Sequence, residues 1–270
     1  MSKTKKPKTL LIGWDAADWN VITPLINKGV MPTLANLISK GSHGKIATLN
    51  PPLSPLLWTS IATGKRAYDH GITGFTELGP DQKTVRAIRG SSRTAKTFWE
   101  IFSENNIKTN VIGWWPSHPA EAVNGHMVSN FYGLCNISYG EEWPMMSRTV
   151  YPNKVEEVLK ELRLHPGELT PEILKPFFPD AENLLSNNDE VLRSVMKILA
   201  HCSSIHNATT WLMENTEWDC TAVYYDALDH FSHLAMKYHP PKIDGISSRD
   251  FKNYHYIVEA AYRFHDMMLD

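Results

Sequence analysis

A serine followed directly by a proline precedes an apolar, helix-forming run, and such a serine could act as a nucleophile. The pair is Ser54-Pro55, and the run extends from Leu56 to Thr63. Serine at the N-cap with proline at the first helical position favours a helix start. The Ser54 hydroxyl would then lie at the positive end of the helix dipole, near backbone N–H groups that can hold a phosphate. The alternative is that Ser54 only caps the helix.

Carboxylate and imidazole side chains elsewhere could bind a metal ion that activates this hydroxyl. Asp15 ends a short apolar run. Asp229 and His233 lie four residues apart, so on a helical turn both face one way and can share one ion. These ligand types suit zinc, manganese or iron rather than calcium. Asp15 could instead cap a helix, and Asp229 and His233 could lie on a surface turn.

The pattern of apolar residues predicts an α/β fold that positions these side chains. Apolar runs at 9–15, 108–115 and 220–226 predict buried parallel strands, and ligands of open α/β sheets bind at the carboxyl ends of the strands. A further strand is predicted over 45–49. Helices are predicted over 19–39 in two pieces broken at Gly29 and Pro32, over 56–63, over 94–105, near 207–214, and over 249–269.

The middle of the chain differs from both ends because prolines punctuate its amphipathic segments, such as 155–164 and 191–199. We predict that residues 131–201 form an inserted helical cap. Residues 1–130 and 202–270 would then form the core, a mostly parallel sheet sandwiched by helices. The last predicted helix reaches the end of the chain without a glycine, proline or capping residue. The core is therefore predicted to be incomplete at its C-terminal side.

Composition excludes several classes of function. With 27 basic and 29 acidic residues, the chain has no excess of positive charge with which to bind nucleic acid. Cys135, Cys202 and Cys220 lie far apart, which argues against a disulfide framework and a zinc-thiolate site. No apolar run is long enough for a signal-peptide core or a membrane span. The sequence thus predicts a cytoplasmic protein that acts on a small molecule, without a membrane or nucleic-acid partner.

Four stretches of the sequence resemble the type I phosphodiesterase/nucleotide pyrophosphatase branch of the alkaline phosphatase superfamily. They are IGWDAADW, PPLSPLLWTSIATGKRAYDHGITGF, GWWPSHPAEAVNGHMVSN and DALDHFSH, in the order found in that family. The most specific part is the TG…HGI element after the hydroxyl-proline helix start. The resemblance covers about residues 9–130 and 220–270, and it leaves the predicted cap unmatched. It implies an alkaline-phosphatase-like fold.

The resemblance also implies a metal-dependent hydrolase of phosphate mono- or diesters with a covalent phosphoserine intermediate. Two divalent ions, zinc or manganese, would hold the ester. Matched by position, Asp15 would bind the first ion, and Ser54 would be the nucleophile that also contacts metal. Asp229 and His233 would be two ligands of the other ion. Asp226 is the rival ligand because it lies nearer the strand end, and its replacement is predicted to cost less than that of Asp229.

The sequence departs from the family pattern in two respects. It has no SDHG-like motif, whose Asp and His bind the metal beside the nucleophile, and no further His for the other metal. His265 and Asp266 lie within a predicted helix and are not given that role. Leu57 stands where nucleotide pyrophosphatases have an asparagine that helps to bind phosphate. The chain is either a fragment of a longer enzyme, inert and poorly soluble in isolation, or a protein with an incomplete site.

Two other functions remain open within this resemblance. One is a phosphomutase of the same superfamily, and the other is a non-catalytic binding protein that has lost half of its metal ligands. A sulfatase is disfavoured because no arginine follows Ser54-Pro55 at the required position. His70, Lys65 and Trp114 are predicted to be a structural, a solvated and a core residue, respectively.

Overall fold

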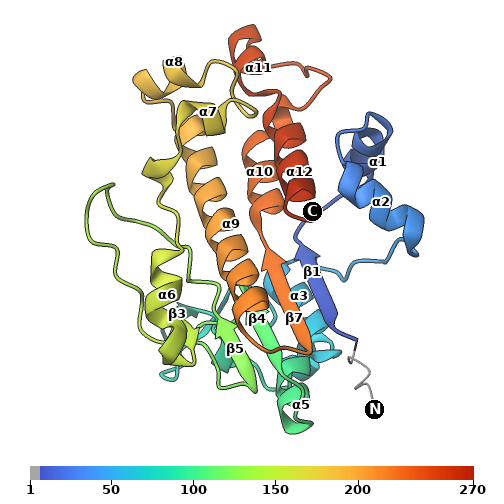
Figure 1. Ribbon diagram of the computed structural model, residues 1–270, viewed down its shortest axis with the longest axis vertical. Coiled ribbons are helices and arrows are strands. Elements are labelled where there is room, and N and C mark those ends of the chain that lie inside the picture. The colour runs from blue at the N-terminus through green and yellow to red at the C-terminus, as the bar shows by residue number, and fades with distance from the viewer. Residues whose placement is uncertain (1–6) are drawn as a thin grey trace.

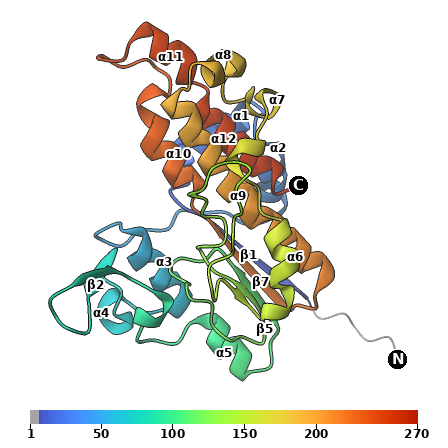
Figure 2. The same ribbon diagram turned by 90° about the vertical axis from the view of Figure 1, so that its left-hand side faces the viewer.

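A five-stranded, mostly parallel sheet lies between two layers of helices in the computed structural model, which describes residues 7–270 (Figure 1, Figure 2). Residues 1–6 of the predicted core lie outside the described residues. The strand order is β1 (Thr9–Trp14), β7 (Cys220–Tyr225), β4 (Thr109–Ile112), β5 (Gly125–Val128) and β6 (Val150–Tyr151). Only β6 runs antiparallel to its neighbour. The predicted α/β sandwich is confirmed.

The two faces of the sheet are buried by different helices. One face packs against α3 (Ser54–Thr63) and α5 (Phe98–Glu104), and Met127 and Tyr224 lie on it. The other face packs against the long helix α9 (Glu190–Asn215), and Val128 and Tyr225 lie there. Because the side chains of a strand alternate between faces, central strands covered on both sides are mostly apolar, although β4 and β7 also bury Thr109, Asn110 and Thr221. This explains why their apolar runs could be recognised in the sequence.

The remaining helices and a hairpin surround this sandwich. They are α1 (Trp19–Asn27), α2 (Pro32–Lys40), α4 (Ala67–His70), α6 (Glu156–Glu161), α7 (Pro171–Leu174), α8 (Ala181–Ser186), α10 (Ala227–Ala235), α11 (Ser248–Tyr254) and α12 (Ile257–Met267), with the hairpin β2 (Thr76–Leu78) and β3 (Val85–Ala87). None of the helices within residues 7–270 is long and apolar enough to cross a membrane.

Helices α1 and α2 have the predicted break between them, but they pack beside α12 rather than over the sheet (Figure 1). Asp266 of α12 accepts hydrogen bonds from the N–H groups of Thr33 (3.1 Å) and Leu34 (2.7 Å). It thereby caps α2, whose own N-cap residue, Met31, makes no side-chain cap bond. Asp266 thus has a structural role, in agreement with its exclusion from the predicted site.

Several predicted elements differ from the structure. Residues 45–49 form no strand, since no neighbouring strand pairs with them and Ile46 is 93% exposed. The segments 191–199 and 207–214 belong to one continuous helix, α9. The predicted helix over 249–269 is two helices, α11 and α12, with His255 and Tyr256 between them. The helix predicted over 94–105 begins only at Phe98, because Thr97 and Glu100 form a capping box there.

Helix α9 runs through the boundary predicted between cap and core at residues 201 and 202. Leu174 and Phe178 of the predicted cap also share one buried apolar cluster with Ile112 and Val128 of the sheet. The structure thus shows extensive packing between these two parts. Their division into separate domains stays a prediction.

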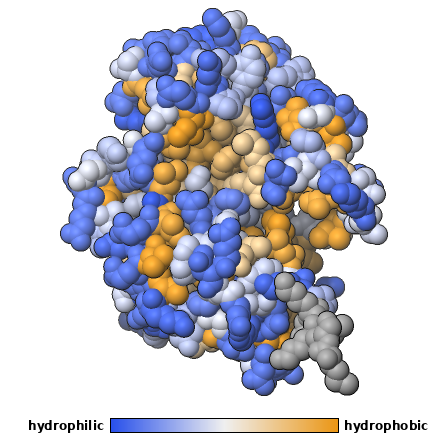
Figure 3. All heavy atoms as spheres, viewed as in Figure 1, coloured by the Kyte–Doolittle hydropathy of each residue, from blue (hydrophilic) through white to orange (hydrophobic). Residues whose placement is uncertain are grey.

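Strand β1 lies at an edge of the sheet, and among residues 7–270 it pairs with β7 alone. Leu10 is 45% and Leu11 38% exposed, so the predicted burial is wrong for the first half of this strand. Figure 3, which has the same view as Figure 1, shows apolar surface between the α1–α2 pair and the rest of the molecule. An exposed, apolar edge strand can pair with another strand.

Candidate active site

The carboxyl ends of β1 and β7 bring Asp15 and Asp226 to the same level of the sheet. Trp14 is in register with Tyr225, and the N–H of Asp15 donates to the Tyr225 carbonyl at 2.9 Å. Helix α10 begins directly after Asp226 and carries Asp229 and His233. The strand-end carboxylates therefore meet at the edge of the sheet where α/β proteins bind their ligands.

Two side chains hold the Asp15 carboxylate, which is 8% exposed. Trp58 Nε1 donates to Oδ1 at 3.0 Å, and the Tyr224 hydroxyl donates to Oδ2 at 2.7 Å. Each oxygen retains acceptor capacity for a further ligand. The alternative role as a helix N-cap does not apply to Asp15, because Asp18 caps α1 by accepting from the N–H of Asn20 at 2.8 Å.

Helix α3 approaches Asp15 with the face that carries Ser54. Ser54 and Trp58 lie four residues apart and hence on one face, and Trp58 reaches Asp15. Gly13 permits this approach, since a Cβ at that position would lie 2.5 Å from the Trp58 ring. The N-cap residue is Leu53, and no side chain makes a cap bond, so the Ser54 hydroxyl does not cap the helix. Its proximity to Asp15 stays a prediction, supported by the Trp58 contact.

Two carboxylate–histidine pairs with the same four-residue spacing lie at the start of α10. Nε2 of His233 is 3.5 Å from Oδ1 of Asp229, so the pairing expected from the sequence is present. Nε2 of His230 is 3.3 Å from Oδ2 of Asp226, and His201 of α9 joins this second pair at 3.7 Å. His230 and His201 were not among the predicted site residues, although Asp226 and His230 show the same spacing that identified Asp229 and His233.

The charges at this edge affect one another. Burial and the nearby charge of Asp15 raise the pKa of Asp229. Burial alone would also raise the pKa of Asp226, but the charges of His201 and His230 and a hydrogen bond from His230 lower it overall. The hydrogen bond to Asp226 raises the pKa of His230. A carboxylate whose pKa is raised by a neighbouring carboxylate marks a place where a bound cation would be favourable.

The carboxylate and imidazole groups at this edge are suitable ligands for a divalent ion, but there are too few of them to complete a metal site. Carboxylate oxygen and imidazole nitrogen are suitable ligands for zinc and manganese. Catalytic zinc sites usually have three protein ligands. In the part of the chain that the structure describes, no group of three or more His, Cys, Asp or Glu side chains is arranged to hold an ion. The described residues thus offer partial sets of ligands.

The residues around α3 support this helix. His70 is fully buried, and its Nδ1 accepts from the N–H of Ile72 at 3.1 Å. Nε2 therefore carries the proton and donates to the Ser60 hydroxyl at 3.0 Å. Trp114 is 1% exposed and donates to the Trp58 carbonyl at 3.1 Å. His70 and Trp114 thus have the structural roles predicted for them, and Lys65 is exposed as expected.

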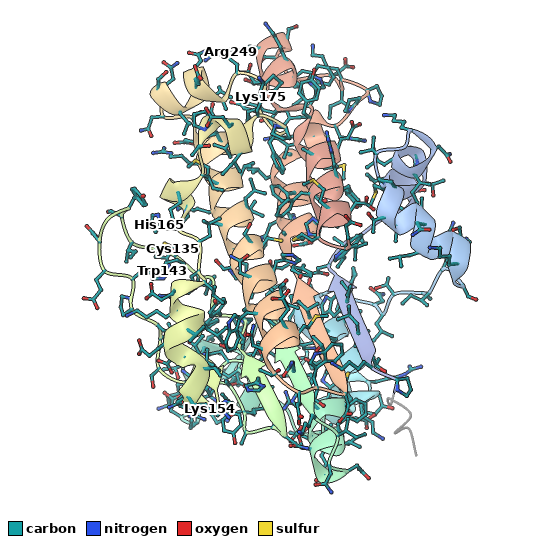
Figure 4. All side chains as sticks on the ribbon, viewed as in Figure 1. Cys135, Trp143, Lys154, His165, Lys175 and Arg249 are labelled. Carbon is teal, nitrogen blue, oxygen red and sulfur yellow. The ribbon has the colours of Figure 1, made fainter. Side chains whose placement is uncertain are left out.

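The three cysteines are free thiols, as predicted. Cys135 lies near Trp143 and His165, beside α6 and away from α1 and α2 (Figure 4). Arg163 stacks on Trp143 with 4.0 Å between its guanidinium and the ring centroid. Cys202 is buried, with its sulfur 3.9 Å from Nε2 of His265. Burial raises the pKa of the Cys202 thiol, so this sulfur is held as the neutral thiol rather than as a metal-binding thiolate.

Comparison with known proteins agrees with this architecture. A family model described as "Type I phosphodiesterase / nucleotide pyrophosphatase" matches residues 9–270. The chain belongs to this family. The match includes residues 131–201, which the sequence resemblance left unmatched. No curated protein matches the chain.

Two solved structures similar to this family member are those of phosphonoacetate hydrolase from Sinorhizobium meliloti 1021, with phosphonoacetate and with phosphonoformate. Each has a TM-score of 0.54 and 14% sequence identity, and the alignment covers 98% of this chain and 52% of the solved chain. The likeness shows a shared fold. This chain spans about half the length of the structures that it matches.

Proposed function

We propose that the protein is a metal-dependent hydrolase of phosphate mono- or diesters that acts through a phosphoserine intermediate on Ser54. The observation that carries the proposal is the convergence of three features at one edge of the sheet. These are the held Asp15 carboxylate, helix α3, which reaches that carboxylate through Trp58, and the carboxylate–histidine pairs of β7 and α10. Membership of a phosphodiesterase family supports phosphoester hydrolysis.

In this proposal, Asp15 and Ser54 hold one divalent ion, zinc or manganese. The sequence assigned Asp229 and His233 to the other ion, and the contact of Asp226 with His230 makes that pair a second candidate. When bound, the ions would stabilise negative charge on the ester and on the serine oxygen. The N-terminal N–H groups of α3 would bind phosphate oxygens. Trp58 and Tyr224 would orient the Asp15 carboxylate through their hydrogen bonds.

The phosphomutase alternative uses the same nucleophile, and no contact in the structure favours it. The binding-protein alternative has one observation in its favour, because the ligand sets are incomplete among the described side chains. An activity assay separates it from the hydrolase.

The assay uses the full-length gene product that contains this chain. We expect it to release nitrophenolate from 4-nitrophenyl phosphate or its bis ester, to lose this activity with EDTA, and to regain it with zinc or manganese. The control is the circular dichroism spectrum of the EDTA-treated protein, which shows whether it stays folded. A folded protein that hydrolyses neither ester with either ion would contradict the proposal and favour a binding function.

The hydrogen bonds to Asp15 lead to a second expected result. Tyr224→Phe keeps the ring and Trp58→Phe keeps an aromatic side chain, and each removes one donor to the carboxylate. Loss of a partner that orients a ligand commonly costs about 10- to 100-fold in metal affinity or activity. We expect losses of this size in kcat/KM and in the affinity for manganese measured by calorimetry.

Two matched variants serve as controls. Trp218→Phe and Tyr132→Phe remove the same groups from side chains that donate to backbone carbonyls elsewhere. We expect these controls to bind manganese as the unmodified protein does. Equal losses in both pairs of variants would show a general effect on stability and would contradict the positioning role.

A further inference from the structure

Three basic side chains come together at the carboxyl edge of the sheet from distant parts of the sequence. The N–H of Gly90 donates to the His118 carbonyl at 2.9 Å, which places Arg89 beside His118. The N–H of Ala120 donates to the Arg148 carbonyl at 2.8 Å, so the segment before β6 lies beside the segment that contains His118. The backbone thus holds Arg89, His118 and Arg148 on adjoining segments. We call these three residues the basic cluster.

The His118 ring is fixed by its neighbours. It stacks on Phe131 with 4.5 Å between centroids and 13° between planes. Nδ1 lies 3.2 Å from the Ser129 hydroxyl, and the His118 N–H donates to Oδ1 of Asn130 at 3.0 Å. Nε2 makes no hydrogen bond with any residue in the range 7–270. A half-buried imidazole held in one orientation therefore presents a free nitrogen atom.

The two arginines lack the acidic partners that their neighbours have. Glu77 pairs with Arg86 and Glu121 with Arg93, each at 2.8 Å. Among the described residues, no carboxylate oxygen lies within 4.0 Å of a guanidinium nitrogen of Arg89 or Arg148, so neither arginine forms an ion pair there. Both arginines are exposed. Burial and then the charges of these two arginines lower the pKa of His118. The imidazole therefore experiences a positive potential, which an anion would relieve.

The position of the basic cluster relates it to the candidate active site. His118 and Ser129 follow the carboxyl ends of β4 and β5, on the edge where Asp226 follows β7. Strand β5 lies three strands from β1, which ends at Asp15, and neighbouring strands are about 4.8 Å apart, so the cluster lies about 14 Å from Asp15 along this edge. One extended small molecule can span this distance.

We infer that the basic cluster binds a second anionic group, phosphate or carboxylate, of an organic phosphate ester whose reacting phosphorus lies near Ser54 and Asp15. Guanidinium groups suit this role because their planar donors match the oxygens of both anions. The role as a substrate subsite rests on the proposed function, whereas the binding of an anion to the cluster does not.

Nuclear magnetic resonance of His118 tests anion binding without an assay of activity. Inorganic phosphate is titrated into the full-length protein at constant ionic strength, and the His118 pKa is measured from its ring carbon shifts. We expect phosphate to raise this pKa in a saturable manner, because a bound anion stabilises the imidazolium. Arg89→Gln and Arg148→Gln should weaken the phosphate response at least about tenfold in apparent affinity. Arg86→Gln, three residues before Arg89 but paired with Glu77, is the matched control.

Hydrolysis of two matched esters tests the role as a subsite. Octyl phosphate and octane-1,8-diol bisphosphate differ by the second phosphate, which lies about 14 Å from the first in an extended molecule, the span estimated from the strand spacing. We expect Arg89→Gln and Arg148→Gln to lower kcat/KM about tenfold for the bisphosphate and to leave kcat/KM for octyl phosphate unchanged.

The outcomes separate this inference from the proposed function. Equal losses for both esters, or a His118 response that chloride reproduces or that persists in both arginine variants, would overturn the inference. Absence of hydrolysis of either ester, together with an arginine-dependent response to phosphate, would reject the proposed function and retain the anion site.

Discussion

Ser54→Ala in the full-length protein is expected to lower kcat/KM for phosphoester hydrolysis on the order of 10⁴-fold or more, since loss of a nucleophile removes the covalent pathway. The methyl group that replaces the hydroxymethyl group fits the same half-buried position at the start of α3. The hydroxyl does not cap the helix, so the substitution should leave α3 intact. The loss is therefore expected in kcat, without a comparable loss of stability.

A second measurement links this loss to the covalent intermediate. Acid quenching during turnover, followed by mass spectrometry of proteolytic peptides, should find one phosphoryl group on Ser54. Ser60→Ala is the matched control on the same helix, because the Ser60 hydroxyl hydrogen-bonds to the Leu56 carbonyl and to His70. A Ser54→Ala protein that retains turnover within a fewfold of the unmodified protein would show that Ser54 is not the nucleophile.

Local signals in the sequence predicted those parts of the fold that depend on short segments. The apolar runs of β1 and β7 end in Asp15 and Asp226, and their parallel pairing puts both carboxylates at one edge. The Ser54-Pro55 pair predicted the start of α3 to within two residues, since the helix expected from Leu56 begins at Ser54. These features could be recognised because strand periodicity and helix-start preferences involve neighbouring residues.

Other features depend on contacts between distant segments. The strand expected at 45–49 does not form because no strand lies beside it, and propensity alone does not supply a partner. The donors to Asp15 could not be predicted, since Trp58 is 43 and Tyr224 is 209 residues away in sequence. His201 reaches Asp226 only because α9 covers β7. Partners of this kind become visible only in the folded chain.

The choice between the two carboxylate–histidine pairs leads to the second large expected effect. The sequence predicted a greater loss for replacement of Asp229, but the contacts favour Asp226. Asp226 is level with Asp15 and lies near two histidines, whereas the side chain of His233, the partner of Asp229, is 80% exposed. The histidines lower the pKa of Asp226, so it stays ionised as a metal ligand must. We expect Asp226→Asn to lower kcat/KM on the order of 10³-fold, and Asp229→Asn on the order of 10-fold.

Asparagine preserves the volume and removes the charge, so the comparison isolates the carboxylate. Bound manganese per chain, measured by calorimetry, should fall in parallel with turnover for Asp226→Asn, because loss of a ligand lowers both the affinity for the ion and the rate of hydrolysis. Asp250→Asn is the control, since its carboxylate lies on α11, away from the strand ends. A greater loss of both manganese and turnover in Asp229→Asn would restore Asp229 and His233 as the ligand pair. In that case Asp226 would serve instead to orient His201 and His230 behind the ion.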